Sequence, residues 1–211
     1  MLAAIVLLGF LPLIVNAQEK CKALEMNDKV REFITDQHNQ LRSKFALGNG
    51  YESKPAKNMY QLKYDCQLEN EAQKLALTCD LLQSLNGVNY FLTAGPDADN
   101  TEPEHIFKNL LNSWISYIED NEYTFSLTTY QGNPNFPQMV WGSTTRLGCA
   151  LNTNCTYYEM HADSVVCRYE QPGNVPGEVI YEAGDPCKQD SDCTTYPGSK
   201  CLADKGLCVK P

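Results

Sequence analysis

The chain has 211 residues, and its 26 acidic side chains outnumber its 17 basic ones, which gives a formal net charge of −9. A surface of that sign repels phosphate backbones and anionic lipids, so the composition argues against nucleic-acid binding and polybasic membrane attachment. A length near 200 residues suits one ordinary domain with a small appendage. The charge remains compatible with a basic partner.

The N-terminus is predicted to be a secretory signal peptide over residues 1–17. This stretch has no charged side chain, and it is apolar almost throughout from Leu2 to Val15. It is shorter than the roughly 20 residues that a membrane-spanning helix needs, and it ends at the small residue Ala17, where the chain becomes polar. We therefore expect a secreted, extracellular chain without a transmembrane segment. A buried N-terminal helix is the alternative.

All ten cysteines follow the predicted signal peptide, and an even number in a secreted chain predicts five disulfides. The spacing of the cysteines does not determine which of them pair. A zinc cluster is the rival interpretation, but the spacings form no paired C-x-x-C units. The ten are Cys21, Cys66, Cys79, Cys149, Cys155, Cys167, Cys187, Cys193, Cys201 and Cys208.

Hydrophobic spacing predicts three helices in the first part of the chain. The first begins at Asp28, the expected N-cap, and stops near Gly48, and the second covers about residues 65–78. Residues 83–101 are rich in turn-forming residues. Thr101 and Glu104 then form a capping box that opens the third helix.

The later part of the chain predicts strands and a disulfide-rich tail. Residues 131–138 contain a glycine and two prolines, and we expect them to be irregular. Short strands are expected at 139–141, 147–151 and 165–169, so the whole is an α+β layered domain. From residue 177 to the end, four cysteines without apolar periodicity predict a small stapled tail.

Candidate catalytic groups are few. The histidines are His38, His105 and His161, and none stands in a metal-binding frame such as H-E-x-x-H. There is no G-x-S-x-G elbow and no phosphate-binding glycine loop, and disulfides would consume the thiols. We therefore expect no catalytic residue, no metal site and no cofactor. Asn154 begins a glycosylation sequon, and its modification stays open because Cys155 is expected in a disulfide.

Several motifs carry a family resemblance. The stretches NFPQMVW at 135–141 and VVCRYEQPGN at 165–174 resemble the two signatures of the CAP superfamily, which contains cysteine-rich secretory, antigen 5 and pathogenesis-related proteins. The resemblance extends over about residues 28–176, and GDPC at 184–187 is similar to the hinge of the parasitic-nematode branch. It implies a three-layer α-β-α sandwich over residues 18–176 and a hinge-like, cysteine-rich tail over 177–211.

The resemblance also implies a central cleft in which many members bind a divalent metal with two histidines and two acidic residues. In this sequence the aligned positions hold Gln83, Val88, Tyr117 and Asn135. These residues lack the imidazole and carboxylate donors that Zn²⁺ or Mg²⁺ prefers. We therefore expect that the metal chemistry of the cleft is lost.

With these four positions replaced, the chain resembles hookworm members of the family that block receptors on host platelets and neutrophils. The resemblance implies a non-enzymatic parasite effector that binds a host cell-surface protein, for which a platelet or leukocyte integrin is the candidate. Ala183-Gly184-Asp185 matches a tripeptide that platelet integrins recognise, although a simple turn before Pro186 is the other interpretation. The alternative function is extracellular binding of a sterol or fatty acid in the cleft.

Overall fold

The computed structural model describes residues 21–23, 25–50, 53–80, 86–94, 102–119 and 134–211, except for the side chains of 117–119. The predicted signal peptide and Thr101 of the predicted capping box lie outside these ranges. None of the described helices has the length and apolarity needed to cross a membrane.

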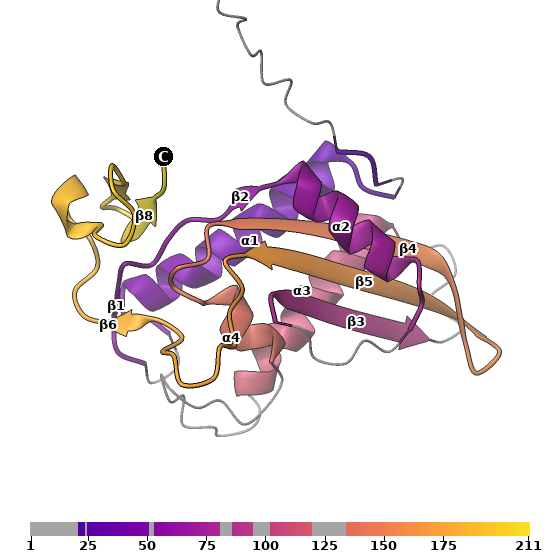
Figure 1. The fold of residues 1–211 in the computed structure, drawn as a ribbon. Helices are drawn as coiled ribbons and strands as arrows, with labels where there is room; N and C mark the ends of the chain where they lie inside the picture. The colour runs from indigo at the N-terminus through magenta and orange to yellow at the C-terminus, as the bar shows by residue number, and fades with distance from the viewer. Residues whose placement is uncertain (1–20, 24, 51–52, 81–85, 95–101, 120–133) are drawn as a thin grey trace, which may run out of the picture.

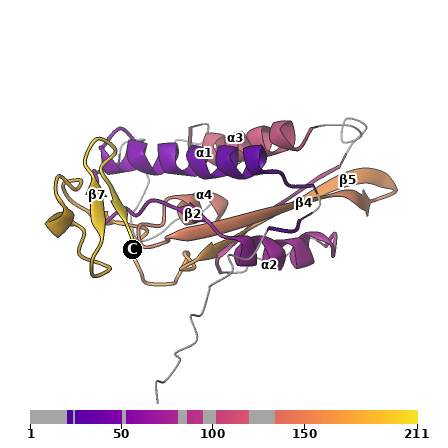
Figure 2. The same ribbon diagram turned by 90° about the horizontal axis from the view of Figure 1, so that it is seen from above.

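A four-stranded sheet lies between two layers of helices (Figures 1 and 2). Seen from above in Figure 2, helices α1 and α3 cover one face and helix α2 covers the other. The strand order is β2-β4-β5-β3, in which only the β2–β4 pair is parallel. This confirms the predicted α+β sandwich. The elements are α1 (Asp28–Ala46), β2 (Lys63–Tyr64), α2 (Cys66–Ala76), β3 (Val88–Ala94), α3 (Pro103–Glu119), β4 (Arg146–Tyr157) and β5 (Met160–Glu170).

The first two helices start at capping side chains. Asn27, not Asp28, is the N-cap of α1, because its Oδ1 accepts from the Val30 N–H at 3.0 Å. The prediction was wrong by one residue, and Asp28 instead places its carboxylate in the first turn, near the positive end of the helix dipole. Asp65 caps α2 by accepting from two backbone N–H groups.

The first signature folds as a short helix, α4 (Asn135–Met139). The expectations of an irregular segment at 131–138 and a strand at 139–141 were therefore wrong for the residues that the structure describes. Pro137 is tolerated because it lies in the first turn, where its missing N–H has no intrahelical partner to lose. Phe136 and Met139 are both buried, so burial on one face of the turn favours the helix.

Strand β3 was missed within the turn-rich segment expected at 83–101. It pairs antiparallel with β5 over seven residues, from Val88 opposite Arg168 to Ala94 opposite Ala162. Its sequence, VNYFLTA, consists mostly of β-branched and aromatic residues, but too briefly to stand out between the glycines and aspartates around it. These residues form a strand because they pair with β5, which lies far along the chain.

All ten cysteines form disulfides within the chain. The Cys149–Cys167 bridge crosses between β4 and β5, whereas the Cys79–Cys155 bridge ties the segment after α2 to β4. The two tail bridges interleave along the sequence. The pairs are Cys21–Cys66, Cys79–Cys155, Cys149–Cys167, Cys187–Cys201 and Cys193–Cys208.

The cysteine-rich tail packs against the sandwich at one end (Figure 1). The Cys208 N–H donates to the Met59 carbonyl at 2.8 Å, and the Gln61 N–H donates to the Cys208 carbonyl at 2.7 Å. Leu207 is fully buried in the main core. The remaining elements are β1 (Ala56–Lys57) paired with β6 (Glu182–Ala183), the 3₁₀ turn η2 (Asp190–Asp192), and β7 (Lys200–Leu202) paired with β8 (Leu207–Val209).

Candidate functional site

Two of the four positions aligned with the metal ligands lie on β3 and α4, which contact each other. Val88 is the first residue of β3 and Asn135 the first residue of α4. The Asn135 side chain joins the two elements, because its Oδ1 accepts from the Tyr90 N–H at 3.3 Å and its Nδ2 donates to the Tyr90 carbonyl at 3.4 Å. Asn135 therefore holds the edge of the sheet as a neighbouring strand would.

The side chains at the other two positions lie outside the described part of the structure. Tyr117 lies in the last turn of α3, and its side chain is not among those described. Gln83 lies outside the described residues. That these four positions share one site therefore stays a prediction.

A chain of buried hydrogen bonds runs behind this edge. The Nδ1 of His38 lies 2.8 Å from the Ile34 carbonyl, which can only accept, so Nδ1 carries the proton. The Nε2 atom then accepts from the Tyr169 hydroxyl at 2.8 Å. Asn89 Nδ2 donates to that hydroxyl and also to the Asn135 carbonyl, at 3.2 and 2.7 Å. The chain links α1, β5, β3 and α4.

Burial keeps the side chains of this hydrogen-bond network uncharged. His38 has no exposed surface, and burial lowers its pKa to about 4, with a further lowering from the Arg42 charge. Burial also raises the pKa of Tyr169 well above its ordinary value. A buried neutral imidazole and a phenol that resists ionisation make a poor base and a poor nucleophile. The hydrogen-bond network therefore serves to position helices and strands rather than to transfer protons.

Arg42 anchors the same end of the domain. Its guanidinium is fully buried and donates to the carbonyls of Tyr60, Met139, Gly142 and Thr144 at 2.6–3.1 Å. Burial lowers its pKa to about 9. Four backbone acceptors replace the water that a guanidinium would otherwise bind, so one side chain fixes the segment before β2 and the segment from α4 to β4.

The described residues at the junction of β3 and α4 do not fit a divalent metal. Val88 offers no donor atom, and the Asn135 amide oxygen already accepts a backbone hydrogen bond. Within the described ranges, the one group of metal-ligand residue types is Cys187, Cys193 and Cys208, and all three are consumed in disulfides. No step of chemistry is therefore derived through a metal.

The other predicted site residues lie on the surface. Asp185 and Ala183 are exposed, and the Gly184 N–H donates to the Pro55 carbonyl at 2.9 Å, which holds the tripeptide beside β1. Asn154 is exposed in β4, and its Nδ2 donates to Glu25 at 3.4 Å. The disulfide at Cys155 is buried. An exposed Asn154 is compatible with glycosylation, which stays a prediction.

A pocket that sequence patterns did not reveal lies between the sandwich and the tail. Its volume is about 230 Å³. A second pocket, of about 260 Å³, lies beside β2 and the C-terminal residues. The first is lined by Asn58, Trp141, Gly142, Ser143, Glu178, Val179, Ile180, Tyr181, Glu182 and Thr195. No local motif marks these residues, because four separate segments of the chain build the pocket.

Comparisons with known proteins agree with the fold. "Ancylostoma secreted protein" of Ancylostoma caninum is 30% identical over 90% of this chain, but the chain spans only 45% of its length. "Hookworm platelet inhibitor 1" of the same organism is 32% identical over 80% of this chain and 76% of its own length. The solved structure of BmVAL-1 superposes with a TM-score of 0.78 at 31% identity, covering 92% of this chain and 100% of that one.

The crystal structure of hookworm platelet inhibitor superposes with a TM-score of 0.70 at 30% identity, covering 90% of this chain and 94% of that one. The family model for the cysteine-rich secretory protein family, CAP, matches residues 35–169, which run from within α1 to the last but one residue of β5. The chain belongs to the CAP family of cysteine-rich secretory proteins.

Proposed function

We propose that this protein is a secreted parasite effector without enzymatic activity, which binds a receptor on the surface of host cells. A platelet integrin is the first candidate receptor. The observation that carries the proposal is the similarity to hookworm platelet inhibitor in sequence and in fold. That relative is named for the inhibition of platelets, and the match covers most of both chains.

The described part of the cleft supports a binding role over a catalytic one. The signature histidine is replaced by Asn135, whose amide is engaged with β3, and the one buried histidine nearby is held neutral. A zinc titration by calorimetry is expected to show no one-to-one site in the micromolar range. A tight site of that stoichiometry would contradict this part of the proposal.

The tripeptide Ala183-Gly184-Asp185 is the proposed point of integrin contact. Asp185 is exposed, and no hydrogen bond or ion pair involving its carboxylate occurs within the described ranges. The sequence matches a tripeptide that platelet integrins recognise, and the exposed aspartate leaves its carboxylate accessible to a receptor. The neighbouring Cys187–Cys201 bridge limits the conformations of this segment, which would reduce the entropy lost on binding.

The experiment is adhesion of human platelets to fibrinogen and to collagen, with the disulfide-intact chain of residues 18–211 titrated in. We expect dose-dependent inhibition by the folded protein and none by the reduced protein. Asp185→Ala should weaken inhibition by about tenfold or more, as expected for loss of a charged group at the centre of an interface. Asp204→Ala is the matched control, because Asp204 is also an exposed aspartate of the tail.

The outcomes separate the parts of the proposal. If the folded protein leaves adhesion to both surfaces unchanged, the platelet receptor is wrong. If Asp185→Ala inhibits as well as the unmodified protein, the receptor contact lies elsewhere on the surface.

Lipid binding is the alternative function. The two pockets described above hold about 230 and 260 Å³, below the roughly 300–1,000 Å³ of sites for drug-sized ligands. Segments 81–85 and 120–133 lie outside the described residues, so lipid binding in the central cleft stays a prediction. Solvent extraction of protein purified from eukaryotic cells, followed by mass spectrometry, tests it, and an empty protein would count against it.

A further inference from the structure

The 230 Å³ pocket between the sandwich and the tail has the shape and chemistry of a site for one long side chain. It is smaller than typical sites for drug-sized ligands, which span about 300–1,000 Å³. Its inner wall contains two buried aromatic residues, Trp141 and Tyr181. We propose that this pocket receives an arginine side chain of a basic protein partner.

The walls of the pocket are fixed by backbone contacts. The Gly142 N–H donates to the Ile180 carbonyl at 2.7 Å, which joins the two segments that carry the aromatic residues. A Cβ atom at Gly142 would lie 3.1 Å from Tyr181 Cβ, so a larger residue would push the segments apart. Since Arg42 donates to the Gly142 carbonyl at 3.0 Å, the wall is tied to the buried core. The pocket is therefore already formed before a partner arrives.

Asn58 of the sandwich fixes the pocket on the side that faces the tail. Asn58 has a φ of 53°, a left-handed conformation that asparagine adopts more readily than most residues. Its Oδ1 accepts from the Thr194 N–H at 2.9 Å, and its Nδ2 lies 3.4 Å from Glu182 Oε1. Asn58 thus holds the carboxylate of Glu182 at the pocket.

The rim of the pocket carries negative charge. Glu178 and Glu182 both line it, and both are exposed. Lys57 pairs with Glu182 at the rim, where its Nζ lies 3.1 Å from Glu182 Oε2. Glu178 has no ion pair within the described ranges, so the three groups together leave an excess of one negative charge. The net charge of −9 for the whole chain has the same sign and also favours the approach of a positively charged partner.

Arginine matches this combination better than lysine does. A guanidinium is planar and weakly hydrated, and it can donate to two carboxylates at once. Its aliphatic stem would contact Val179, one of the few large apolar side chains that is substantially exposed, at 43%.

The test is a titration of the disulfide-intact protein with the capped peptide acetyl-Gly-Arg-Gly-amide, followed by NMR. The indole N–H of Trp141 should shift, whereas that of Trp114, which is fully buried on α3 outside the pocket, should not. One side chain should bind with a dissociation constant on the order of 1 mM. The peptides that carry citrulline or lysine in place of arginine should bind at least about threefold more weakly.

Glu178→Gln is the primary variant, because this side chain makes no described contact that folding would need. We expect it to weaken binding of the arginine peptide about threefold, and the double variant with Glu182→Gln to weaken it about tenfold. Glu32→Gln, at an exposed position on α1, is the matched control and should leave binding unchanged.

Absence of a Trp141 shift, equal binding of the citrulline or lysine peptide, or full binding by Glu178→Gln would each overturn the proposal. This titration does not depend on the identity of the host receptor. It can therefore succeed or fail independently of the platelet assay.

Discussion

At the scale of single residues, buried polar side chains join the elements of this protein. Arg31 and Glu69 form a two-point ion pair between α1 and α2, with nitrogen–oxygen distances of 2.6 and 3.0 Å. The Glu69 carboxylate has no exposed surface, and it also accepts from the Ala23 N–H and the Tyr64 hydroxyl. Such groups need several partners, because each unsatisfied donor or acceptor in the core costs about 1–3 kcal/mol.

The buried imidazole of His38 predicts that the stability of the protein depends on pH. Its pKa is about 4 in the folded protein, against 6.5 for an unperturbed histidine. Between these values the unfolded chain binds a proton that the native protein does not, so stability is fully present above pH 6.5 and falls as the pH drops toward 4. This one group should contribute a loss of about 3 kcal/mol in the free energy of unfolding.

The measurement is urea unfolding at several pH values between 7 and 4. His38→Gln should lower stability at neutral pH but should show a correspondingly smaller loss on acidification. His105→Gln is the control, since His105 is exposed at the start of α3. Equal acid sensitivity of His38→Gln and the unmodified protein would show that the imidazole is already charged in the native state.

At the scale of elements, the layers of the sandwich approach each other closely at one glycine. Gly148 lies in β4, and a Cβ atom there would fall 2.5 Å from the Asp65 carbonyl at the start of α2. Because that neighbour is backbone, it cannot rotate away. The sequence Leu147-Gly148-Cys149 therefore owes its glycine to helix–strand packing rather than to a turn.

Gly148→Ala should destabilise the protein by about 3 kcal/mol or more, because the helix must move away from the sheet. Gly177→Ala is a useful comparison, because a Cβ at Gly177 meets nothing within 4 Å although its φ is +84°. That variant should cost only about 1 kcal/mol, from backbone conformation alone. Thermal unfolding of both variants checks the prediction, and an equal cost would rule out the packing explanation.

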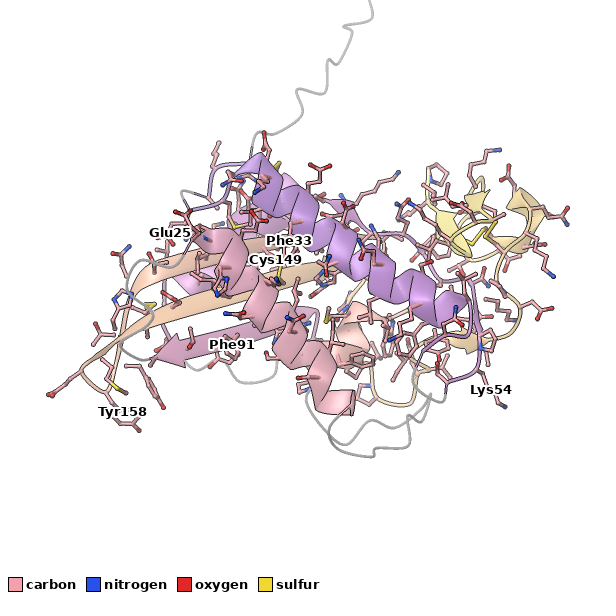
Figure 3. All side chains as sticks on the ribbon, turned by 180° about the vertical axis from the view of Figure 1, so that it is seen from behind. Glu25, Phe33, Lys54, Phe91, Cys149 and Tyr158 are labelled. Atoms are coloured by element: carbon pink, nitrogen blue, oxygen red, sulfur yellow. A yellow bond between two sulfur atoms is a disulfide. The ribbon has the colours of Figure 1, made fainter. Side chains whose placement is uncertain are left out.

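At the scale of the whole molecule, the sandwich and the tail share a core. Leu207 of β8 joins the buried cluster of the sandwich, and Tyr196 of the tail stacks edge-on with Tyr60 at 4.8 Å between ring centroids. The Tyr196 hydroxyl also donates to the Ser143 carbonyl at 2.8 Å. By contrast, Tyr158 projects into solvent at the far tip of the β4–β5 hairpin, with 79% of its surface exposed (Figure 3).

If the two parts form one cooperative unit, Leu207→Ala should destabilise the whole protein by about 2–5 kcal/mol, the cost of removing a fully buried leucine side chain. Unfolding should remain a single transition when followed by near-ultraviolet circular dichroism. Leu202→Ala, at a half-buried position of β7, should cost less. Separate transitions for the sandwich and the tail would show that the tail unfolds independently.

The sequence by itself determined the fold class, the family, the approximate extent of α1 and α2, and the presence of disulfides. These features follow from local spacing, from capping residues such as Asp65 and from signature motifs, all of which lie within short stretches of chain.

Only the tertiary structure decided the position of β3, the helical form of the first signature, the pairing of the cysteines and the existence of the pocket beside Glu178 and Trp141. Each depends on partners far apart in sequence. For example, β3 forms against β5, about 75 residues later, and Asn58 of the sandwich binds Thr194 of the tail. Local patterns cannot predict such contacts, because their energy comes from surfaces that exist only after the chain has folded.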